Sequence, residues 1–167
     1  RGFRRMVGAA VVLVLALIML GAWVRLTDAG LGCPDWPGCY GKLTPAQAKA
    51  QIAQAVQEQG GEHRPLSMGK AWREMIHRYV AIALGLLVVA IAITAWRRRV
   101  ELRQSPLLAI ALVGVVVLQG LFGKWTVTLL LKPAIVTGHL LGGMLTFALL
   151  LWLWLRQQPP ARYLDAE

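Results

Sequence analysis

Four stretches of the chain are almost free of charged side chains, and they lie at residues 6–24, 79–96, 104–123 and 133–155. The second stretch extends back through His77. Each stretch approaches or exceeds the roughly 20 residues that a helix needs to cross a bilayer. Because lipid offers no hydrogen bonds, only helices and closed barrels can satisfy the backbone there. The pattern therefore predicts four transmembrane helices.

The segments between these stretches differ greatly in length. The first, residues 25–73, is long, whereas residues 97–105 and 124–132 form short loops. Within the long loop, Thr44-Pro45-Ala46-Gln47 has the signals of a helix start, and Gly60-Gly61 would end that helix. The predicted fold class is an all-α membrane protein, a four-transmembrane-helix bundle with a long outer loop between helices 1 and 2. We expect one domain over residues 1–158 and a disordered tail over 159–167.

The first apolar stretch follows Arg1, Arg4 and Arg5, as the apolar part of a cleavable signal peptide would. It is long, however, and no A-x-A cleavage site follows it. We therefore interpret it as a membrane anchor.

Composition agrees with a membrane protein, because 57% of the residues are hydrophobic and 16% are charged. A soluble domain of this size carries about a quarter charged residues. The net charge of +10 comes without a basic stripe with interleaved aromatic residues, so we expect no nucleic-acid partner. The basic side chains instead flank the apolar stretches, where they can face anionic lipid.

The orientation in the membrane is predicted from the short basic loop. Arg97, Arg98, Arg99 and Arg103 form the densest short-loop cluster, and such clusters stay in the cytoplasm. The expected location is the bacterial inner (plasma) membrane, with several spans and both termini cytoplasmic. The long loop and the histidine ends of the spans then face outwards.

His77 and His139 are the main candidates for chemistry, because ionisable groups inside membrane segments are costly and are functional by default. Each is expected about six residues, or roughly 9 Å, inside its helix. Two imidazoles at matched depth can ligate one metal, and heme iron suits such a pair. The alternative is a pair bonded to each other or to Glu74 without a metal. Zinc is a weaker candidate, since a hydrolytic zinc site in a bilayer is unusual.

Glu74 lies one helical turn before His77, so the two side chains share a helix face. A carboxylate in this position can accept or deliver protons beside a heme edge. The competing interpretation is a salt bridge to Arg73 or Arg78 at the membrane surface. Among the basic residues at this end, Arg78 is the first candidate to bind a porphyrin propionate.

Both cysteines of the chain, Cys33 and Cys39, lie in the long loop. Pro34, Pro37 and Gly38 bend the segment between them, which can bring the thiols within bonding distance. In an oxidising compartment a disulfide is the expected state. Either a structural staple or a redox-active pair fits this pattern.

The two predicted hairpins resemble each other weakly. Gly21-Ala22-Trp23 closes the first span and Gly123-Lys124-Trp125 closes the third, and in each hairpin the following span carries a histidine near its start. If this is a real duplication, a pseudo-twofold axis relates His77 to His139.

Several motifs resemble those of the heme A synthase family, and they occur in the family's order over about residues 5–155. The first resembles the family's N-terminal signature, and the others resemble motifs of its second, third and fourth helices. The motifs are Gly21-x-x-Val24-Arg25-Leu26-Thr27-x-Ala29-Gly30-Leu31-x-Cys33-Pro34-Asp35-Trp36-Pro37-x-Cys39-x-Gly41, Glu74-x-x-His77-Arg78, Gln119-Gly120-x-x-Gly123-x-Trp125-Thr126-Val127-Thr128, and His139 with Gly142.

The resemblance implies a heme-modifying oxidoreductase that converts the methyl group of heme O to the formyl of heme A by successive hydroxylations, for cytochrome oxidase assembly. The family's usual form has eight helices in two halves. The N-terminal half, which carries the glutamate, holds the substrate heme, and the other half holds a heme B. The chain resembles only the first half, so the implied partners are a second four-helix half or a second copy, the bilayer, and heme O synthase.

Two other functions fit the histidine pair. A bis-histidine membrane cytochrome for electron transfer needs His77 and His139 but neither Glu74 nor the cysteines. A heme-handling chaperone would present heme without altering it.

Overall fold

The computed structural model describes residues 1–58 and 66–157, and its regular structure is entirely helical. Four helices are long and apolar enough to cross a membrane, and two are short. The all-α fold class and the multi-pass membrane character are therefore confirmed. The helices are α1 (Gly2–Leu26), α2 (Lys49–Glu58), α3 (Met68–Arg97), α4 (Arg99–Leu102), α5 (Leu107–Thr128) and α6 (Pro133–Leu155).

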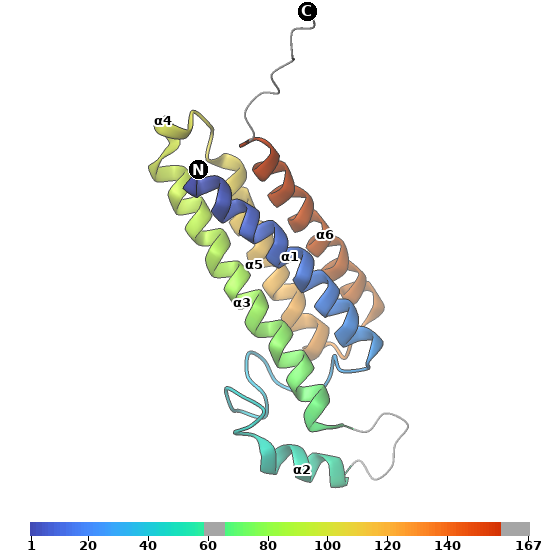
Figure 1. The fold of residues 1–167 in the computed structure, drawn as a ribbon. Helices are drawn as coiled ribbons and strands as arrows, with labels where there is room; N and C mark the ends of the chain where they lie inside the picture. The colour runs from blue at the N-terminus through green and yellow to red at the C-terminus, as the bar shows by residue number, and fades with distance from the viewer. Residues whose placement is uncertain (59–65, 158–167) are drawn as a thin grey trace, which may run out of the picture.

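The four long helices form one bundle (Figure 1). Helix α1 packs beside α3 and α6, and α5 also packs beside α3 and α6. Helices α1 and α5 therefore lie diagonally across the bundle, as do α3 and α6. The N-terminus, α4 and the end of α6 share one end, which we call the basic end. The segment between α1 and α3, with α2, covers the other end, which we call the loop end.

Several helix boundaries differ from the sequence prediction. Helix α3 begins at Met68, well before the predicted start of its span, because Ser67 caps its first turn by accepting a hydrogen bond from the Lys70 amide. The predicted loop 124–132 is too long, since α5 continues to Thr128. The turn to α6 is closed by a hydrogen bond from the Leu131 amide to the Thr126 carbonyl, 2.8 Å long.

The helix signals inside the long loop were only partly correct. Thr44 and Gln47 exchange the expected capping-box hydrogen bonds between side chain and backbone. Residues 45–48 form a turn, however, and α2 begins only at Lys49. The predicted stop at Gly60-Gly61 and the predicted tail 159–167 lie outside the described residues.

The fully buried apolar core fills only the half of the bundle near the basic end. It runs from Phe3 to Val14 on α1, from Leu84 to Ala95 on α3, and includes Leu112 on α5. In the half near the loop end, residues 15–23 of α1, 79–83 of α3, 113–126 of α5 and 133–145 of α6 contain no fully buried residue. Side chains therefore close the bundle tightly in one half and loosely in the other.

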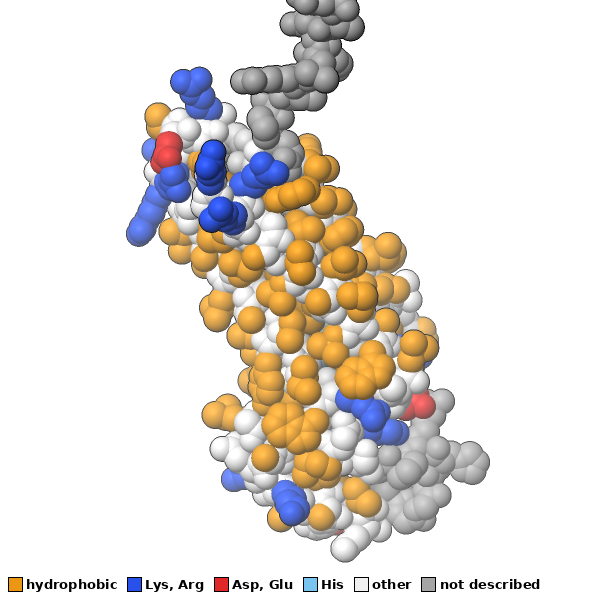
Figure 2. Space-filling view, in the orientation of Figure 1, with side chains coloured by type: hydrophobic (Ala, Val, Ile, Leu, Met, Phe, Trp, Pro, Cys, Tyr) orange, Lys and Arg blue, Asp and Glu red, His pale blue; other side chains and the backbone are white. Residues whose placement is uncertain are grey.

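The surface has the layering expected for a membrane protein. Figure 2 shows a broad apolar band, with most of the basic side chains on this face gathered at the basic end and a smaller group near the loop end. Arginine side chains lie over tryptophan rings at both ends, an arrangement suited to the membrane–water interface. These pairs are Arg4–Trp154, Arg99–Trp96, Arg156–Trp152 and Arg73–Trp23.

Candidate functional site

His77 on α3 and His139 on α6 lie on diagonally opposite helices in the loosely packed half of the bundle. Each imidazole packs against a glycine of a neighbouring helix. A Cβ atom added to Gly21 of α1 would lie 3.0 Å from His77 Cε1, and one added to Gly123 of α5 would lie 3.6 Å from His139 Cε1. Any larger residue at Gly21 would press on the His77 ring, so the glycine makes room for the imidazole.

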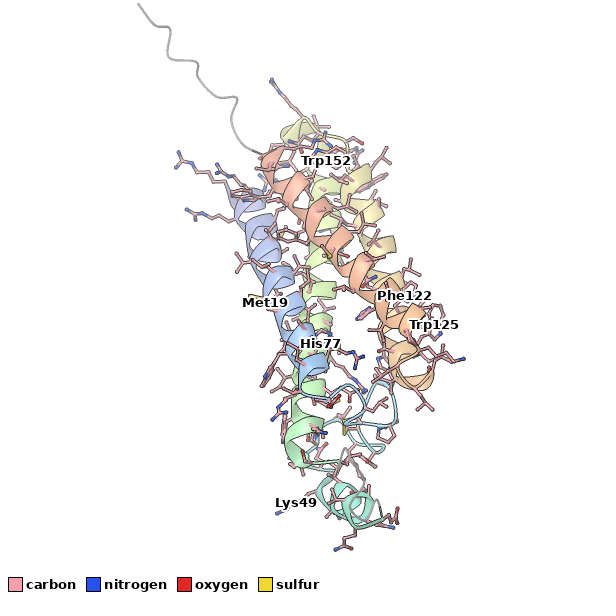
Figure 3. The ribbon with its side chains drawn as sticks, turned by 90° about the vertical axis from the view of Figure 1, so that its right-hand side faces the viewer. Met19, Lys49, His77, Phe122, Trp125 and Trp152 are labelled. Atoms are coloured by element: carbon pink, nitrogen blue, oxygen red, sulfur yellow. A yellow bond between two sulfur atoms is a disulfide. The ribbon has the colours of Figure 1, made fainter. Side chains whose placement is uncertain are left out.

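The two histidines lie at equivalent depth in the bundle, although not for the reason expected. His139 is six residues after the start of α6, as predicted, but His77 is nine residues after the start of α3, because that helix projects beyond the bundle. The two glycines that contact the histidines show the equal depth more directly than the helix starts do. Gly21 lies five residues before the end of α1 at Leu26, and Gly123 lies five residues before the end of α5 at Thr128. Both hairpins therefore bring a glycine and a histidine together at the same level. Figure 3 shows His77 in the same part of the bundle as Met19, Phe122 and Trp125.

The Nδ1 atoms of both histidines are buried and have no hydrogen-bond partner among the described residues. A pair bonded to each other or to Glu74 through these atoms is therefore not what the structure contains. Two imidazoles held at the same level on diagonal helices are the arrangement that ligation of one heme iron by two histidines requires. No group of three or more His, Cys, Asp or Glu that could hold a metal ion occurs in the described part of the chain.

Glu74 is only 4% exposed, and its carboxylate contacts the cysteine loop and Arg78. It accepts a hydrogen bond of 2.9 Å from the Cys33 amide and forms an ion pair with Arg78. The sequence offered a surface salt bridge as the competing interpretation. The ion pair is present but it is buried, because the cysteine loop covers it.

The side chain of Arg78 binds backbone carbonyls of the cysteine loop. Its Nη1 atom donates hydrogen bonds to the carbonyls of Gly38 at 2.6 Å and Asp35 at 2.8 Å, and its Nη2 atom is paired with Glu74. The expected contact of Arg78 with a propionate remains a prediction. In the structure its Nη1 atom already donates hydrogen bonds to carbonyls of the loop.

The disulfide between Cys33 and Cys39 is present, which confirms the pairing. Both cysteines are fully buried in a small apolar cluster with Ile52 of α2 and Met75 of α3. Gly32 allows this loop to lie directly against α3, since a Cβ atom there would lie 2.7 Å from the backbone of Lys70 and Ala71. The position at the centre of a packed cluster favours the structural staple over the redox-active pair.

Two polar residues, Asp35 and Gln119, stand in the family motifs but were given no individual role from the sequence. The Asp35 carboxylate accepts hydrogen bonds from the amides of Tyr40 and Gly41, at 2.6 and 2.8 Å, and so shapes the disulfide loop. Burial, with a smaller contribution from Asp35, raises the pKa of the Tyr40 hydroxyl.

Gln119 on α5 contacts α6 close to His139. The sequence feature that could have drawn attention to it is a lone amide side chain inside an apolar stretch.

The fold and these residues define a class: a multi-pass membrane bundle with a glycine-packed histidine pair and a disulfide-stapled loop between its first two long helices. Residues 4–167 match the family described as cytochrome oxidase assembly protein (COX15-CtaA), and the chain belongs to this family, that of the heme A synthases.

Individual relatives agree. The chain is 44% identical to the heme A synthase of Shewanella oneidensis over 148 residues, which cover 89% of the chain and 43% of that protein. It is 31% identical to the heme A synthase of Hyphomonas neptunium over 179 residues, covering 93% of the chain and 50% of that protein. A third relative, protoheme IX farnesyltransferase 1 of Natronomonas pharaonis, is 31% identical over 111 residues, or 19% of its length. The chain thus spans about half the length of the heme A synthases that it matches.

The buried Glu74–Arg78 pair gives a testable prediction about stability. Arg78→Met leaves the Glu74 carboxylate buried without its cation, and breaking such a pair costs about 3–5 kcal/mol. We expect the Arg78→Met protein in detergent to lose about this much free energy of unfolding. The double variant Glu74→Gln, Arg78→Met should lose less than the sum of the two single changes, because no charge then remains unpaired.

Arg73→Met is the matched control, since Arg73 lies over the Trp23 ring and does not contact Glu74. It should change the free energy of unfolding by less than about 1 kcal/mol. Strictly additive losses for Glu74 and Arg78 would contradict the coupling.

Proposed function

We propose that this chain forms the heme O-binding half of a heme A synthase, the enzyme that oxidises the methyl group of heme O to the formyl of heme A. The single observation that carries the proposal is the pair of interior histidines on diagonal helices, each packed against a glycine at the same depth. Family membership and two relatives named heme A synthase support it.

His77 and His139 would hold the iron of the substrate from opposite sides. Their Nδ1 atoms, which are buried and have no hydrogen-bond partner among the described residues, support this assignment. The bound porphyrin supplies the methyl group that is oxidised and a route for electrons. The protein supplies the two ligands, an apolar surrounding that limits access of water, and a fixed orientation of the ring against the loop end.

Glu74 is the acid–base candidate in this proposal. Oxidation of a methyl group beside an apolar ring builds up charge and releases protons, and a nearby carboxylate can stabilise that charge or accept a proton. In the structure the Glu74 carboxylate is buried and pairs with the Arg78 guanidinium. To act on the substrate, the carboxylate must exchange part of its present contacts with the loop.

The proposal includes partners. Because the chain spans about half of its relatives, a second four-helix half, or a second copy of this chain, would complete the enzyme and hold the heme B of the usual family form. A heme O synthase is the proposed supplier of substrate. Support comes from the Natronomonas pharaonis relative, since a protein named protoheme IX farnesyltransferase contains a segment similar to this chain.

A bis-histidine cytochrome remains the second candidate, and one observation favours it. Glu74 is fully occupied by Arg78 and the Cys33 amide, as a purely structural residue would be. An electron carrier needs nothing more than the histidine pair. Analysis of the extracted porphyrin after exposure to oxygen separates the two functions, because only the synthase converts heme O to hydroxylated products and heme A.

The first prediction from the proposed function concerns ligation of the iron. The purified chain loaded with heme should show the absorption and magnetic resonance spectra of a six-coordinate, low-spin iron. His77→Ala and His139→Ala should each abolish this spectrum, because each change removes one axial ligand. The third histidine of the sequence provides the control, and His63→Ala should leave the spectrum unchanged. A low-spin spectrum that survives either ligand substitution would refute the assignment.

The second prediction concerns Glu74. In the assembled enzyme, Glu74→Gln should leave the low-spin spectrum intact but reduce heme A formation by at least about 100-fold, the lower range for positioned acid–base catalysis. Glu101→Gln makes the same chemical change at the basic end, in an exposed pair with Arg98, and should leave the rate unchanged. Unchanged activity in Glu74→Gln would reduce Glu74 to a structural role and strengthen the cytochrome interpretation.

The third prediction concerns orientation. We propose that both termini are cytoplasmic in the bacterial inner membrane, since the basic end carries Arg97, Arg98, Arg99 and Arg103. A reporter protein fused after Glu58 should be detected outside the membrane, and one fused after Arg99 should be detected inside. The reverse pattern would overturn the orientation and move the histidines to the cytoplasmic side.

A further inference from the structure

Gln119 is the only carboxamide side chain in the four membrane-length helices, all of whose residues are described. It lies on α5, four residues before Gly123, and so one turn farther from the loop end than the glycine that contacts His139. Its amide group makes no hydrogen bond with another described residue. An unpartnered amide in an apolar surrounding is costly, so its presence here requires an explanation.

The side chain of Gln119 points across the bundle and not towards lipid. A Cβ atom added to Gly142 of α6 would overlap the amide nitrogen of Gln119. A Cβ atom on Gly143 would lie 3.9 Å from the amide oxygen of Gln119 and 3.9 Å from Cγ1 of Ile18. Because Ile18 belongs to α1, which is diagonal to α5, the amide lies in the interior between three helices.

The neighbouring hydroxyl group does not satisfy this amide. Thr146, one turn farther along α6, is buried, and its hydroxyl donates a hydrogen bond of 2.8 Å to the Gly142 carbonyl. The Gln119 amide therefore keeps both a donor and an acceptor available within about one helical turn of the histidine level.

The identity of the ligand group rests on the proposed function. A porphyrin held between His77 and His139 carries two carboxylates, and the cations near the histidines lie at the loop end, where Arg25 and Lys70 line one pocket together with Asp28. With the carboxylates at that end, the opposite edge of the ring faces the middle of the membrane and Gln119. In heme O this edge carries a hydroxyethylfarnesyl group, whereas heme B has a vinyl group in its place.

We propose that Gln119 forms a hydrogen bond with the hydroxyl of the hydroxyethylfarnesyl group and so selects heme O over heme B. The hydroxyl is the only polar group on that edge of the ring. A site that is built to bond a hydroxyl rejects an analogue without it, because the amide is then left unpaired against an apolar ring edge. Gln119 is thus a specificity-determining residue for the substrate.

The test is a comparison of two equilibrium titrations. Heme O and heme B are each added to the purified full chain in detergent, and dissociation constants are taken from the low-spin absorption. The farnesyl tail itself favours heme O, so the measured quantity is the ratio of the two constants. Gln119→Leu should reduce the preference for heme O by about three- to tenfold, the range for one net hydrogen bond. Its affinity for heme B should be unchanged or higher.

Val117→Leu is the matched control, since Val117 lies on the same helix, is 60% exposed and faces lipid. Its preference ratio should equal that of the unaltered chain. Gln119→Met, with a similar length and flexibility, provides a second variant in case leucine disturbs the contact with Gly142. Heme B binding reports whether each variant is folded.

Three results would overturn the inference. An unchanged ratio of the two dissociation constants, in a variant that still binds heme, would show that Gln119 does not bind the hydroxyl. Equal weakening for both hemes would show a structural role only. If the unaltered chain gave a low-spin spectrum with neither heme, the proposed function would fail as well, and this outcome is distinct from the other two.

Discussion

The bilayer offers no hydrogen bonds, and this constraint accounts for most of what is distinctive in the structure. Two imidazoles are placed inside a membrane bundle, and their buried Nδ1 atoms have no partner within the described chain. Such groups are tolerated in a membrane only where a ligand, a cavity or another polar group can satisfy them. The positions of Gly21 and Gly123 follow from the same constraint, because each leaves space for an imidazole to stay inside.

The loop end meets this constraint in a different way, by covering charged groups with backbone. Arg78 and Glu74 are buried as a pair, and the loop around the disulfide supplies carbonyls to the arginine and an amide to the glutamate. A buried pair is stable only when its remaining hydrogen-bonding groups are also satisfied. The loop is therefore part of the transmembrane site, because without it the pair at the mouth of the bundle would lack these partners.

The two hairpins are alike inside the bundle and unlike at its rim. Each contributes one histidine and one glycine at the same level, which gives the interior an approximate twofold arrangement. At the rim, however, α1 and α3 are joined by the long stapled segment, whereas α5 and α6 are joined by only four residues. A symmetric pair of histidines thus receives asymmetric surroundings, and of the two only His77 has an acidic residue, Glu74, one turn away.

The sequence by itself determined the four spans, the fold class, the histidine pair and the cysteine pair. Apolar stretches of about 20 residues permit little besides membrane helices, and the two cysteines of the chain lie in one bent loop, where each can pair with the other. It also determined the family, because several motifs occur together and in order.

The tertiary structure alone decided where the side chains of Glu74 and Arg78 point. Both residues can face a heme or a loop from the same helix position, and the choice depends on the loop carbonyls, which are about 40 residues distant in sequence. Helix ends were also misjudged, since α3 and α5 continue past the apolar stretch once Ser67 and the closing turn satisfy their terminal groups. The role of Gly142 could not be read from spacing either, because a small residue reveals a close neighbour but not its identity. Only the packing of α5 against α6 shows that the neighbour is the amide of Gln119.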